Sequence, residues 1–124
     1  MSQDASFDID AQNILRPQVI TASGIGADIP NVSDMEGVVR AILRVGALSA
    51  GTTLAAKLEH SADGASNWSD VPGGAFPPIT VANTGSTIGV DTNAMKAFVR
   101  VNYTATGGTV NLVASGIMVG YRDY

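Results

Sequence analysis

TLAAKLEHSADGASNWSDV, residues 53–71, contains the clearest strand signal, the clearest turn signal and the only tryptophan of the chain. Within it, Leu54 and Leu58 fall on one side of an extended chain and Lys57 falls on the other. This alternation is typical of a strand with one buried and one solvated face. We therefore predict a strand over residues 53–60 whose apolar side faces a core.

The second half of this stretch predicts a turn and a return strand. Asp63 can accept a hydrogen bond from the backbone two residues further on, and Gly64 can adopt a positive φ without steric cost. Trp68 and Val71 then form a short strand, which we expect to end at residues 72–74 (Pro-Gly-Gly), because proline lacks the N–H that a sheet needs. The unit is a predicted β-hairpin.

Length and composition limit the remaining possibilities. The chain has 124 residues, the size of one domain, and no cysteine, so disulfides and thiolate metal sites are excluded. Its 14 glycines and hydrophobic share of 45% favour many short strands and tight turns. With no apolar run of about 18 residues and no basic-then-apolar N-terminus, we expect no membrane span, no secretion signal and synthesis in the cytoplasm.

The net charge of −4 lies in the first quarter of the chain. Residues 1–34 hold five aspartates against one arginine, whereas residues 35–124 hold six acidic and six basic residues. A neutral body lacks the clustered Lys and Arg side chains that replace counterions on phosphates. We therefore expect no nucleic acid partner.

The N-terminal third predicts an arm and a loop. Residues 1–12 are polar and acidic, a composition that favours mobility. Residues 13–21 read as a strand interrupted by Pro17, which belongs at a sheet edge or in an arm laid against another surface. A loop follows. We therefore divide the chain into an N-terminal arm and loop, residues 1–31, and a sandwich domain, residues 32–124.

Residues 35–48 fit a strand and, less well, a short helix. We favour the strand because β-branched residues are dense and alternate in direction between two glycines. Arg40 and Arg44 then share one face with Ile42. That face is either a solvated surface or a contact surface for an acidic partner.

The rest of the chain adds further strands. Residues 75–82 and 86–92 are two strand candidates around a turn at residues 83–85. Residues 98–106 alternate well, and Gly107-Gly108 predicts a two-residue hairpin into a last strand over residues 109–121. Because that strand lacks proline and charge, we expect it to be central in its sheet.

Together these signals predict an all-β fold. Short strands with turns every eight to twelve residues are typical of an antiparallel two-sheet β-sandwich, jelly-roll or Ig-like, or of a small barrel. We expect the sandwich, with an extended N-terminal arm. The strand order stays open.

Few residues could carry chemistry. The single histidine, His60, follows a core-facing position and is expected to be a hydrogen-bonded strand-end residue. Asp63 to Asp70 echo a calcium loop, but a ligand position and the bidentate glutamate are missing, so a turn is favoured. Gly24 and Gly26 open no convincing helix, so a phosphate loop is not supported. We predict no catalytic, cofactor or metal site, and no enzyme.

Trp68 has two interpretations. It either fills the core beside the hairpin, which we favour, or offers a platform on which a sugar stacks.

Several of these pieces occur together in a known family. Residues 58–71 (LEHSADGASNWSDV), then residues 98–101 (FVRV) and a glycine turn into a last hydrophobic strand, resemble small structural proteins of tailed-phage particles, the capsid decoration (cement) proteins. The resemblance implies a non-catalytic protein on the outer surface of the virion capsid. It also implies a homo-oligomer, with a trimer favoured, that bridges neighbouring copies of the major capsid protein.

On this reading the arm and the basic strand would contact the capsid. The candidate partner-binding residues are Phe7, Ile9, Ile14, Leu15, Arg16, Arg40 and Arg44. The alternatives are a tail or baseplate component with the same fold and a carbohydrate-binding β-sandwich module.

Overall fold

The chain folds as a two-layer β-sandwich, which confirms the predicted fold class. This computed structural model describes the backbone of residues 7–123 and the side chains of residues 9–121. The elements in this range are β1 (Phe7–Ile20), β2 (Gly24–Ile25), β3 (Met35–Leu48), β4 (Thr53–Ser61), β5 (Ser69–Ala75), β6 (Thr84–Asp91), the 3₁₀ helix η1 (Thr92–Ala94), β7 (Phe98–Thr106) and β8 (Leu112–Asp123).

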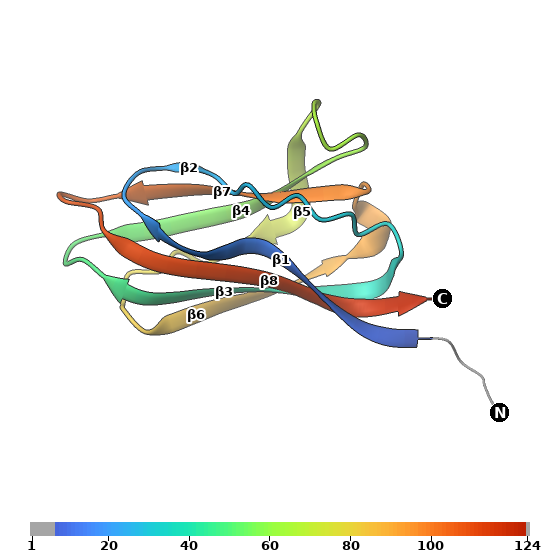
Figure 1. Cartoon of the computed structure of the whole chain (residues 1–124), viewed down its shortest axis with the longest axis horizontal. Coiled ribbons are helices and arrows are strands. Elements are labelled where there is room, and N and C mark those ends of the chain that lie inside the picture. Colours follow the sequence, from blue (N-terminus) through green and yellow to red (C-terminus); the bar gives the residue numbers. More distant parts are fainter. Residues whose placement is uncertain (1–6, 124) are drawn as a thin grey trace.

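The strands form two antiparallel sheets of four. Sheet A has the order β1-β8-β3-β6 and sheet B the order β2-β7-β4-β5. Figure 1 shows the two layers, with sheet B above sheet A. The chain crosses between the layers after most of its strands, and this order is that of an eight-stranded jelly roll. The topology therefore decides between the two sandwich types that the sequence left open.

The core lies between the sheets and follows the predicted alternation. On β3, residues 39, 41, 43 and 45 are buried and face the other sheet, which confirms a strand over this segment rather than a helix. Sheet B supplies the facing layer from β4 and β7. The largest fully buried side chains are Ile14, Leu15, Ile20, Val39, Leu43, Val45, Leu54, Leu58, Val90, Val99, Leu112 and Met118.

The last strand is central in its sheet, as predicted. The prediction of a two-residue hairpin at Gly107-Gly108 is wrong. β8 lies between β1 and β3 in sheet A, whereas β7 pairs with β4 and β2 in sheet B. The segment at Gly107 therefore crosses between sheets instead of closing a two-residue turn. Gly107 has a φ of 139°, and a Cβ there would lie 2.7 Å from the carbonyl oxygen of Gly51. Glycine is needed because two loops touch at this end of the sandwich.

The predicted turn at residues 83–85 is wrong for the same reason. β6 begins at Thr84 and pairs with β3 in sheet A, while the chain before it belongs to sheet B through a single bridge between Ile79 and Leu54. Asn83 has a positive φ of 57°, so the residue does mark a sharp bend. The bend redirects the chain to the other layer.

The hairpin of residues 53–71 is confirmed and longer than predicted. Glu59 lies opposite Asp70 and His60 opposite Ser69. β5 does not stop at Pro72 but continues to Ala75 after a register shift. β5 is the edge strand of sheet B, where proline and a bulge are tolerated.

The described part of the predicted arm belongs to the sandwich. β1 pairs with β8 from Phe7 opposite Asp123 to Ile20 opposite Leu112, as the edge strand that Pro17 predicted. No boundary separates residues 7–31 from the domain, which corrects the predicted division at residue 31. Residues 1–6 lie outside the described range. Between residues 7 and 123 no helix is long and apolar enough to span a membrane.

Candidate functional site: the outer faces of the two sheets

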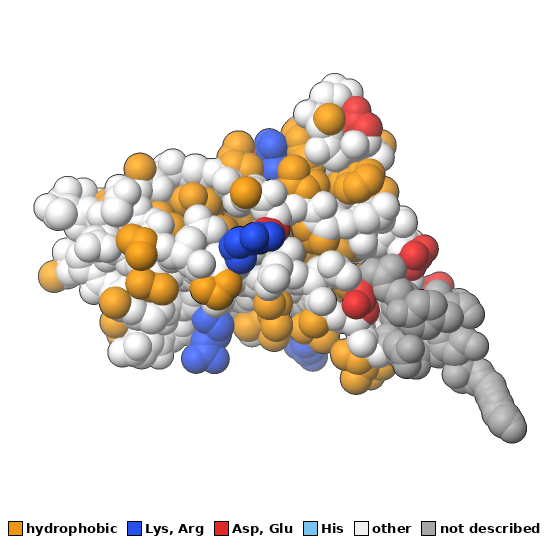
Figure 2. All heavy atoms as spheres, in the orientation of Figure 1, with side chains coloured by type: hydrophobic (Ala, Val, Ile, Leu, Met, Phe, Trp, Pro, Cys, Tyr) orange, Lys and Arg blue, Asp and Glu red, His pale blue; other side chains and the backbone are white. Residues whose placement is uncertain are grey.

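The outer face of sheet A is apolar over much of its area. We call it the A face and define it by the outward residues Ile9, Val19, Val38, Arg40, Ile42, Arg44, Val113, Ile117, Val119 and Tyr121. Four of its apolar side chains are more than half exposed: Ile9 at 72%, Val38 at 65%, Val19 at 63% and Tyr121 at 55%. Figure 2 shows hydrophobic and basic side chains together along the lower margin of the molecule, over sheet A.

Strand register makes these residues contiguous. Ile117 on the central strand lies between Asn13 of β1 and Ile42 of β3, and Ile9 lies opposite Tyr121. Side chains directly opposite on neighbouring strands are about 5 Å apart, close enough to touch. The apolar residues therefore form one continuous surface across three strands.

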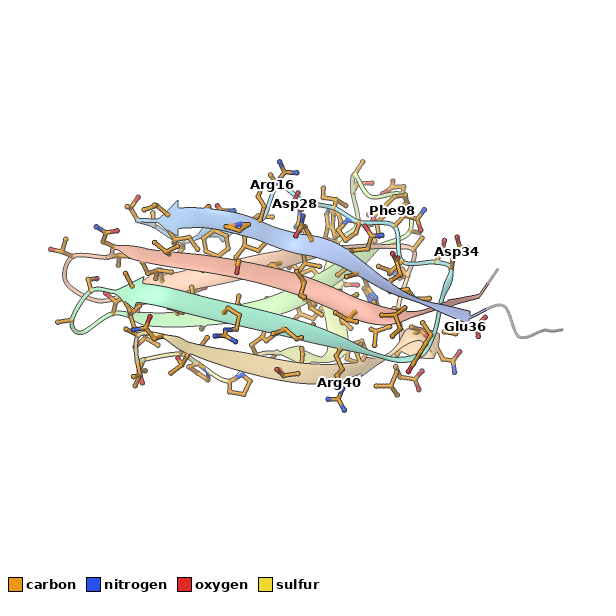
Figure 3. The ribbon with its side chains drawn as sticks, turned by 60° about the horizontal axis from the view of Figure 1, so that its bottom comes forward. Arg16, Asp28, Asp34, Glu36, Arg40 and Phe98 are labelled. Atoms are coloured by element: carbon orange, nitrogen blue, oxygen red, sulfur yellow. The ribbon has the colours of Figure 1, made fainter. Side chains whose placement is uncertain are left out.

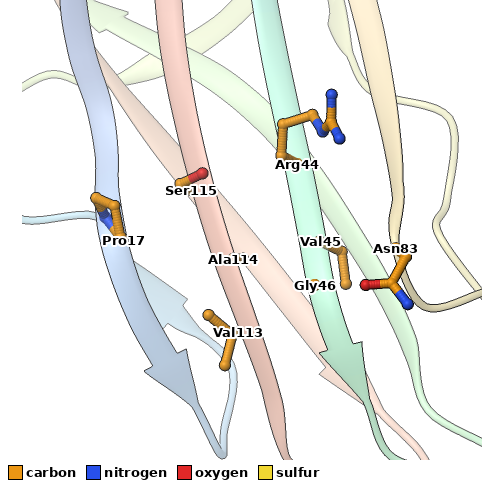
Figure 4. Close-up of a pocket in the computed structure, with 8 residues that line it drawn as sticks. All are labelled: Pro17, Arg44, Val45, Gly46, Asn83, Val113, Ala114 and Ser115. Carbon is orange, nitrogen blue, oxygen red and sulfur yellow. The ribbon is translucent and has the colours of Figure 1, made fainter.

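Two shallow hollows interrupt the A face. One, of about 180 Å³, is lined by Ile9, Val38, Arg40, Val119, Gly120 and Tyr121. The other, of about 210 Å³, lies at the opposite end of the face and is lined by Pro17, Arg44, Val45, Gly46, Asn83, Val113, Ala114 and Ser115 (Figure 4). Both are open depressions that a partner's protruding side chains can fill.

Arg40 and Arg44 are the basic residues of this face. Both are exposed, and neither forms an ion pair with any described residue. Their neighbours on β6 are Gly89 and Gly85, so no adjacent side chain covers them from that strand. A Cβ on Gly85 would lie 2.7 Å from Cδ of Arg44, which shows that the Arg44 side chain lies directly over this glycine.

The outer face of sheet B, the B face, is built differently. Glu59 is 8% exposed and accepts hydrogen bonds from Nε of Arg100 at 2.9 Å and from Nδ2 of Asn102 at 3.4 Å. At the edge of this face, Lys57 and Asp70 form an ion pair at 2.9 Å. The charges of the B face are paired within the chain, whereas the arginines of the A face are not.

Trp68 belongs to this charged cluster and not to the core. Its side chain is half-buried, and the guanidinium of Arg100 lies 4.1 Å from the centre of a Trp68 ring. The expectation that Trp68 fills the core is therefore wrong, because the sandwich buries smaller aliphatic side chains instead. A sugar would have to use the ring face that Arg100 leaves open.

The loop after β4 is a self-contained turn, as expected. The Asp63 carboxylate accepts hydrogen bonds from the N–H groups of Ala65 at 3.0 Å and Ser66 at 2.9 Å, and from the Ser66 hydroxyl at 2.9 Å. These donors hold the pKa of Asp63 well below its ordinary value of 3.8. Among the described residues, no three His, Asp or Glu side chains gather where they could hold a metal ion.

His60 is the hydrogen-bonded strand-end residue that the sequence predicted. It is 6% exposed, and its Nδ1 accepts a hydrogen bond from the N–H of Lys96 at 3.1 Å. Burial lowers the pKa of His60 below 6.5, and the charge of Lys96 lowers it further. The ring is therefore neutral near pH 7 and serves as an acceptor that ties the β6–β7 connection to sheet B.

The structure separates the predicted partner-binding residues into three groups. Ile14 and Leu15 are fully buried, so their assignment to a partner is wrong. Arg16 pairs with Asp28, with Nη2 2.7 Å from Oδ1; both residues are labelled in Figure 3. Only Ile9, Arg40 and Arg44 lie on the A face, and the side chain of Phe7 lies outside the described range.

Sequence reasoning missed most of the A face. Val38, Val113, Ile117 and Tyr121 were not proposed as contact residues, although all four are exposed. A signal was present, because the strands that became β3 and β8 carry apolar residues at both alternating positions. A strand of a two-layer sandwich needs an apolar residue only on its inner side, so the second apolar series predicts an apolar outer face.

No protein-family model matches this sequence, and no curated protein sequence matches it. Among solved structures, the VP2 subviral particle of infectious bursal disease virus matches with a TM-score of 0.57 and 9% identity, over 94% of this chain and 33% of that chain. The Gt strain of the same virus matches with a TM-score of 0.57 and 12% identity, over 99% of this chain and 35% of that chain. This chain thus spans about a third of the viral chains it matches, and the likeness shows a shared fold.

Proposed function

We propose that this chain is a structural protein of a virus particle. The observation that carries the proposal is the A face, an exposed apolar surface across three strands of sheet A, since such surfaces mark protein contacts. The fold shared with chains of infectious bursal disease virus particles supports a place in a virion.

Within this class, we propose a decoration protein on the outer surface of a tailed-phage capsid. It acts without catalysis, as a homo-oligomer with a trimer favoured, and bridges neighbouring copies of the major capsid protein. The resemblance of residues 58–71 and 98–101 to decoration proteins supports this role. In the structure these pieces are neighbours, because β4 pairs with β5 on one side and with β7 on the other.

The resembling motifs have a common physical basis. Glu59, Asp70 and Arg100 lie opposite one another on three adjacent strands, and Trp68 lies against Arg100. Four residues of the resembling stretches, Glu59, Trp68, Asp70 and Arg100, therefore lie together on the B face. We assign the contacts with the capsid to the other face, the A face.

Co-sedimentation with phage heads that lack this protein tests the proposal. We expect saturable binding at a fixed ratio to the major capsid protein, measured by quantitative gel densitometry. Absence of binding to heads, with binding to isolated tails, would instead indicate a tail or baseplate component.

A truncation that tests the N-terminal segment has to leave β1 complete. Removal of residues 1–31 would delete β1 and the buried Ile14, Leu15 and Ile20, so lost binding would report unfolding. A truncation of residues 1–6 leaves β1 complete and tests whether the N-terminal segment contributes to attachment.

A further inference from the structure

We propose that the A face binds a protein surface that is apolar and carries two carboxylates, one for each of Arg40 and Arg44. This inference rests on the proposed function and names the chemistry of the partner: in the particle, the acidic and apolar surface belongs to a neighbouring virion protein.

Three of the four basic side chains that the structure describes outside the A face are paired with carboxylates, and the fourth, Lys96, is exposed and has no ion pair among the described residues. Arg16, Lys57 and Arg100 each have a carboxylate within 2.9 Å. Arg40 and Arg44 have none among the described residues, although both extend from the middle of a long strand. Figure 3 shows Arg40 projecting away from the sandwich. The A face therefore presents two cations whose counter-charges are not supplied by the described part of the chain.

Much of the surface beside these cations is apolar, although the β8 neighbour of Arg44 is Ser115. Ile42 lies between the two arginines on β3, and Val119 and Ile117 are the β8 neighbours of Arg40 and Ile42. A partner that covers this surface removes water from both guanidinium groups. A desolvated charge without a counter-charge is strongly unfavourable, so the covering surface must contribute carboxylates.

Strand geometry sets the spacing of these carboxylates. Arg40 and Arg44 are four residues apart on the same side of β3, which places their Cα atoms about 13 Å apart at about 3.3 Å per residue. Guanidinium groups bind carboxylates through two parallel hydrogen bonds, so both the position and the orientation of each acid are selected.

The area of the A face suits a specific protein contact. Four strands about 4.8 Å apart and roughly ten residues long give a face of roughly 600 Å². A standard protein interface buries about 800 Å² on each partner. The sheet face with its rim therefore provides an interface of ordinary size.

A second copy of the same face is a poor partner. A two-fold packing of the A face on itself, centred on Ile42, would set Arg40 of one copy against Arg44 of the other. Like charges in a covered interface are unfavourable. The chemistry favours a partner with the opposite charge.

Nucleic acid fits this surface less well than protein does. The chain has a net charge of −4, and Glu36 and Asp91 are exposed at one end of the A face. Two arginines neutralise few phosphates, and these acids would repel a continuous polyanion. An apolar surface with two placed carboxylates matches both the cations and the exposed valines and isoleucines.

The test uses phage heads that lack the protein and three purified full-length proteins. These are the wild type, the Arg40→Glu/Arg44→Glu variant and the control Lys96→Glu, which reverses an exposed charge outside the A face. We expect saturable binding of the wild type and of the control, and at least a hundredfold higher Kd for the double variant. The exposure of both arginines predicts that all three proteins fold, which circular dichroism and urea denaturation check.

A fourth variant and the oligomeric state complete the test. Arg40→Lys/Arg44→Lys keeps both charges but loses the two-pronged geometry, and we expect an intermediate Kd. Wild-type Kd for the Glu double variant would overturn the inference while leaving the proposed function intact. No head binding by the wild type would overturn both. Disassembly of an oligomer by the Glu substitutions with head binding kept, or salt-resistant DNA binding through the arginines, would also overturn the inference.

Discussion

The two outer faces of this sandwich differ in whether their charged side chains form ion pairs within the described part of the chain. On the B face, Arg100 is held between Glu59 and the ring of Trp68. On the A face, Arg40 and Arg44 lie opposite Gly89 and Gly85 of β6 and form no ion pair in the described part of the chain. The charges of the B face are paired within the chain, whereas the described residues supply no ion pair to the arginines of the A face.

Because of this difference, we expect B-face residues to affect the stability of the isolated chain and A-face residues to affect binding. Substitutions on the B face remove interactions that the isolated chain already makes, so they should change its free energy of unfolding. Substitutions on the A face remove exposed groups, which contribute little to the stability of the isolated chain. We expect them to change binding to the partner instead. Each of the following experiments can contradict this assignment of stability to the B face and of binding to the A face.

The largest effect on stability is expected at Glu59. Glu59→Gln removes the carboxylate that faces Arg100, and both side chains are largely covered, at 11% and 19% exposure. Loss of one partner of a covered ion pair leaves an uncompensated charge, so we expect a loss of about 3 kcal/mol in the free energy of unfolding. Urea denaturation measures it. The double variant Glu59→Gln/Arg100→Gln should recover part of the loss, and additive losses would show that the two residues do not interact.

Much of the fold could be predicted from the sequence because strand alternation is local. Residues 39, 41, 43 and 45 gave the inner side of β3 directly, and Pro17 gave β1 as an edge strand. Sheet membership could not be predicted, because the bends at Asn83 and Gly107 look like hairpin turns whether the next strand joins the same sheet or the opposite one.

The candidate site was predictable only in part for a related reason. Ile14 and Leu15 are adjacent in sequence and both buried, which is possible because β1 shifts register between residues 13 and 15. Regular alternation exposes one of two neighbouring residues, so the strand pattern alone does not indicate that both belong to the core. Arg40 and Arg44 were identified because they lie on a regular strand, where direction follows directly from position.

The second-largest effect is expected on the affinity for phage heads, from substitutions in the apolar part of the A face. Val38→Thr/Ile117→Thr keeps β-branched side chains but places hydroxyl groups in the contact, so we expect head binding to weaken by about 2 kcal/mol, or roughly thirtyfold in Kd. Thr104→Val makes the reverse exchange at an exposed position of the B face and should leave Kd unchanged. Equal effects of the two exchanges on Kd would contradict the assignment of binding to the A face.

A smaller effect should appear in the pH dependence of stability, and it comes from sheet B. Burial lowers the pKa of His60, so the unfolded chain binds a proton more readily than the folded chain does. The contribution of His60 is therefore complete above its ordinary pKa of 6.5 and is lost as the pH falls through the lower pKa of the folded state. Urea midpoints between pH 7.5 and 5 should fall more for the wild type than for His60→Asn, which keeps an acceptor for the N–H of Lys96.

The smallest effect on stability is expected at the exposed ion pair of Lys57 and Asp70. It tests whether the B face is stabilised by the pairing of charges or by their burial. The pair is short, at 2.9 Å, but its side chains are 43% and 65% exposed, so water and salt screen most of its attraction. Lys57→Gln should shift the urea midpoint far less than Glu59→Gln does, and less at high salt than at low salt. A shift as large as that of Glu59→Gln would show that pairing of charge, rather than its burial with Trp68, stabilises the B face. The A-face arginines would then gain as much from an exposed carboxylate as from one desolvated by an apolar partner, and the case for an apolar partner would lose its electrostatic basis.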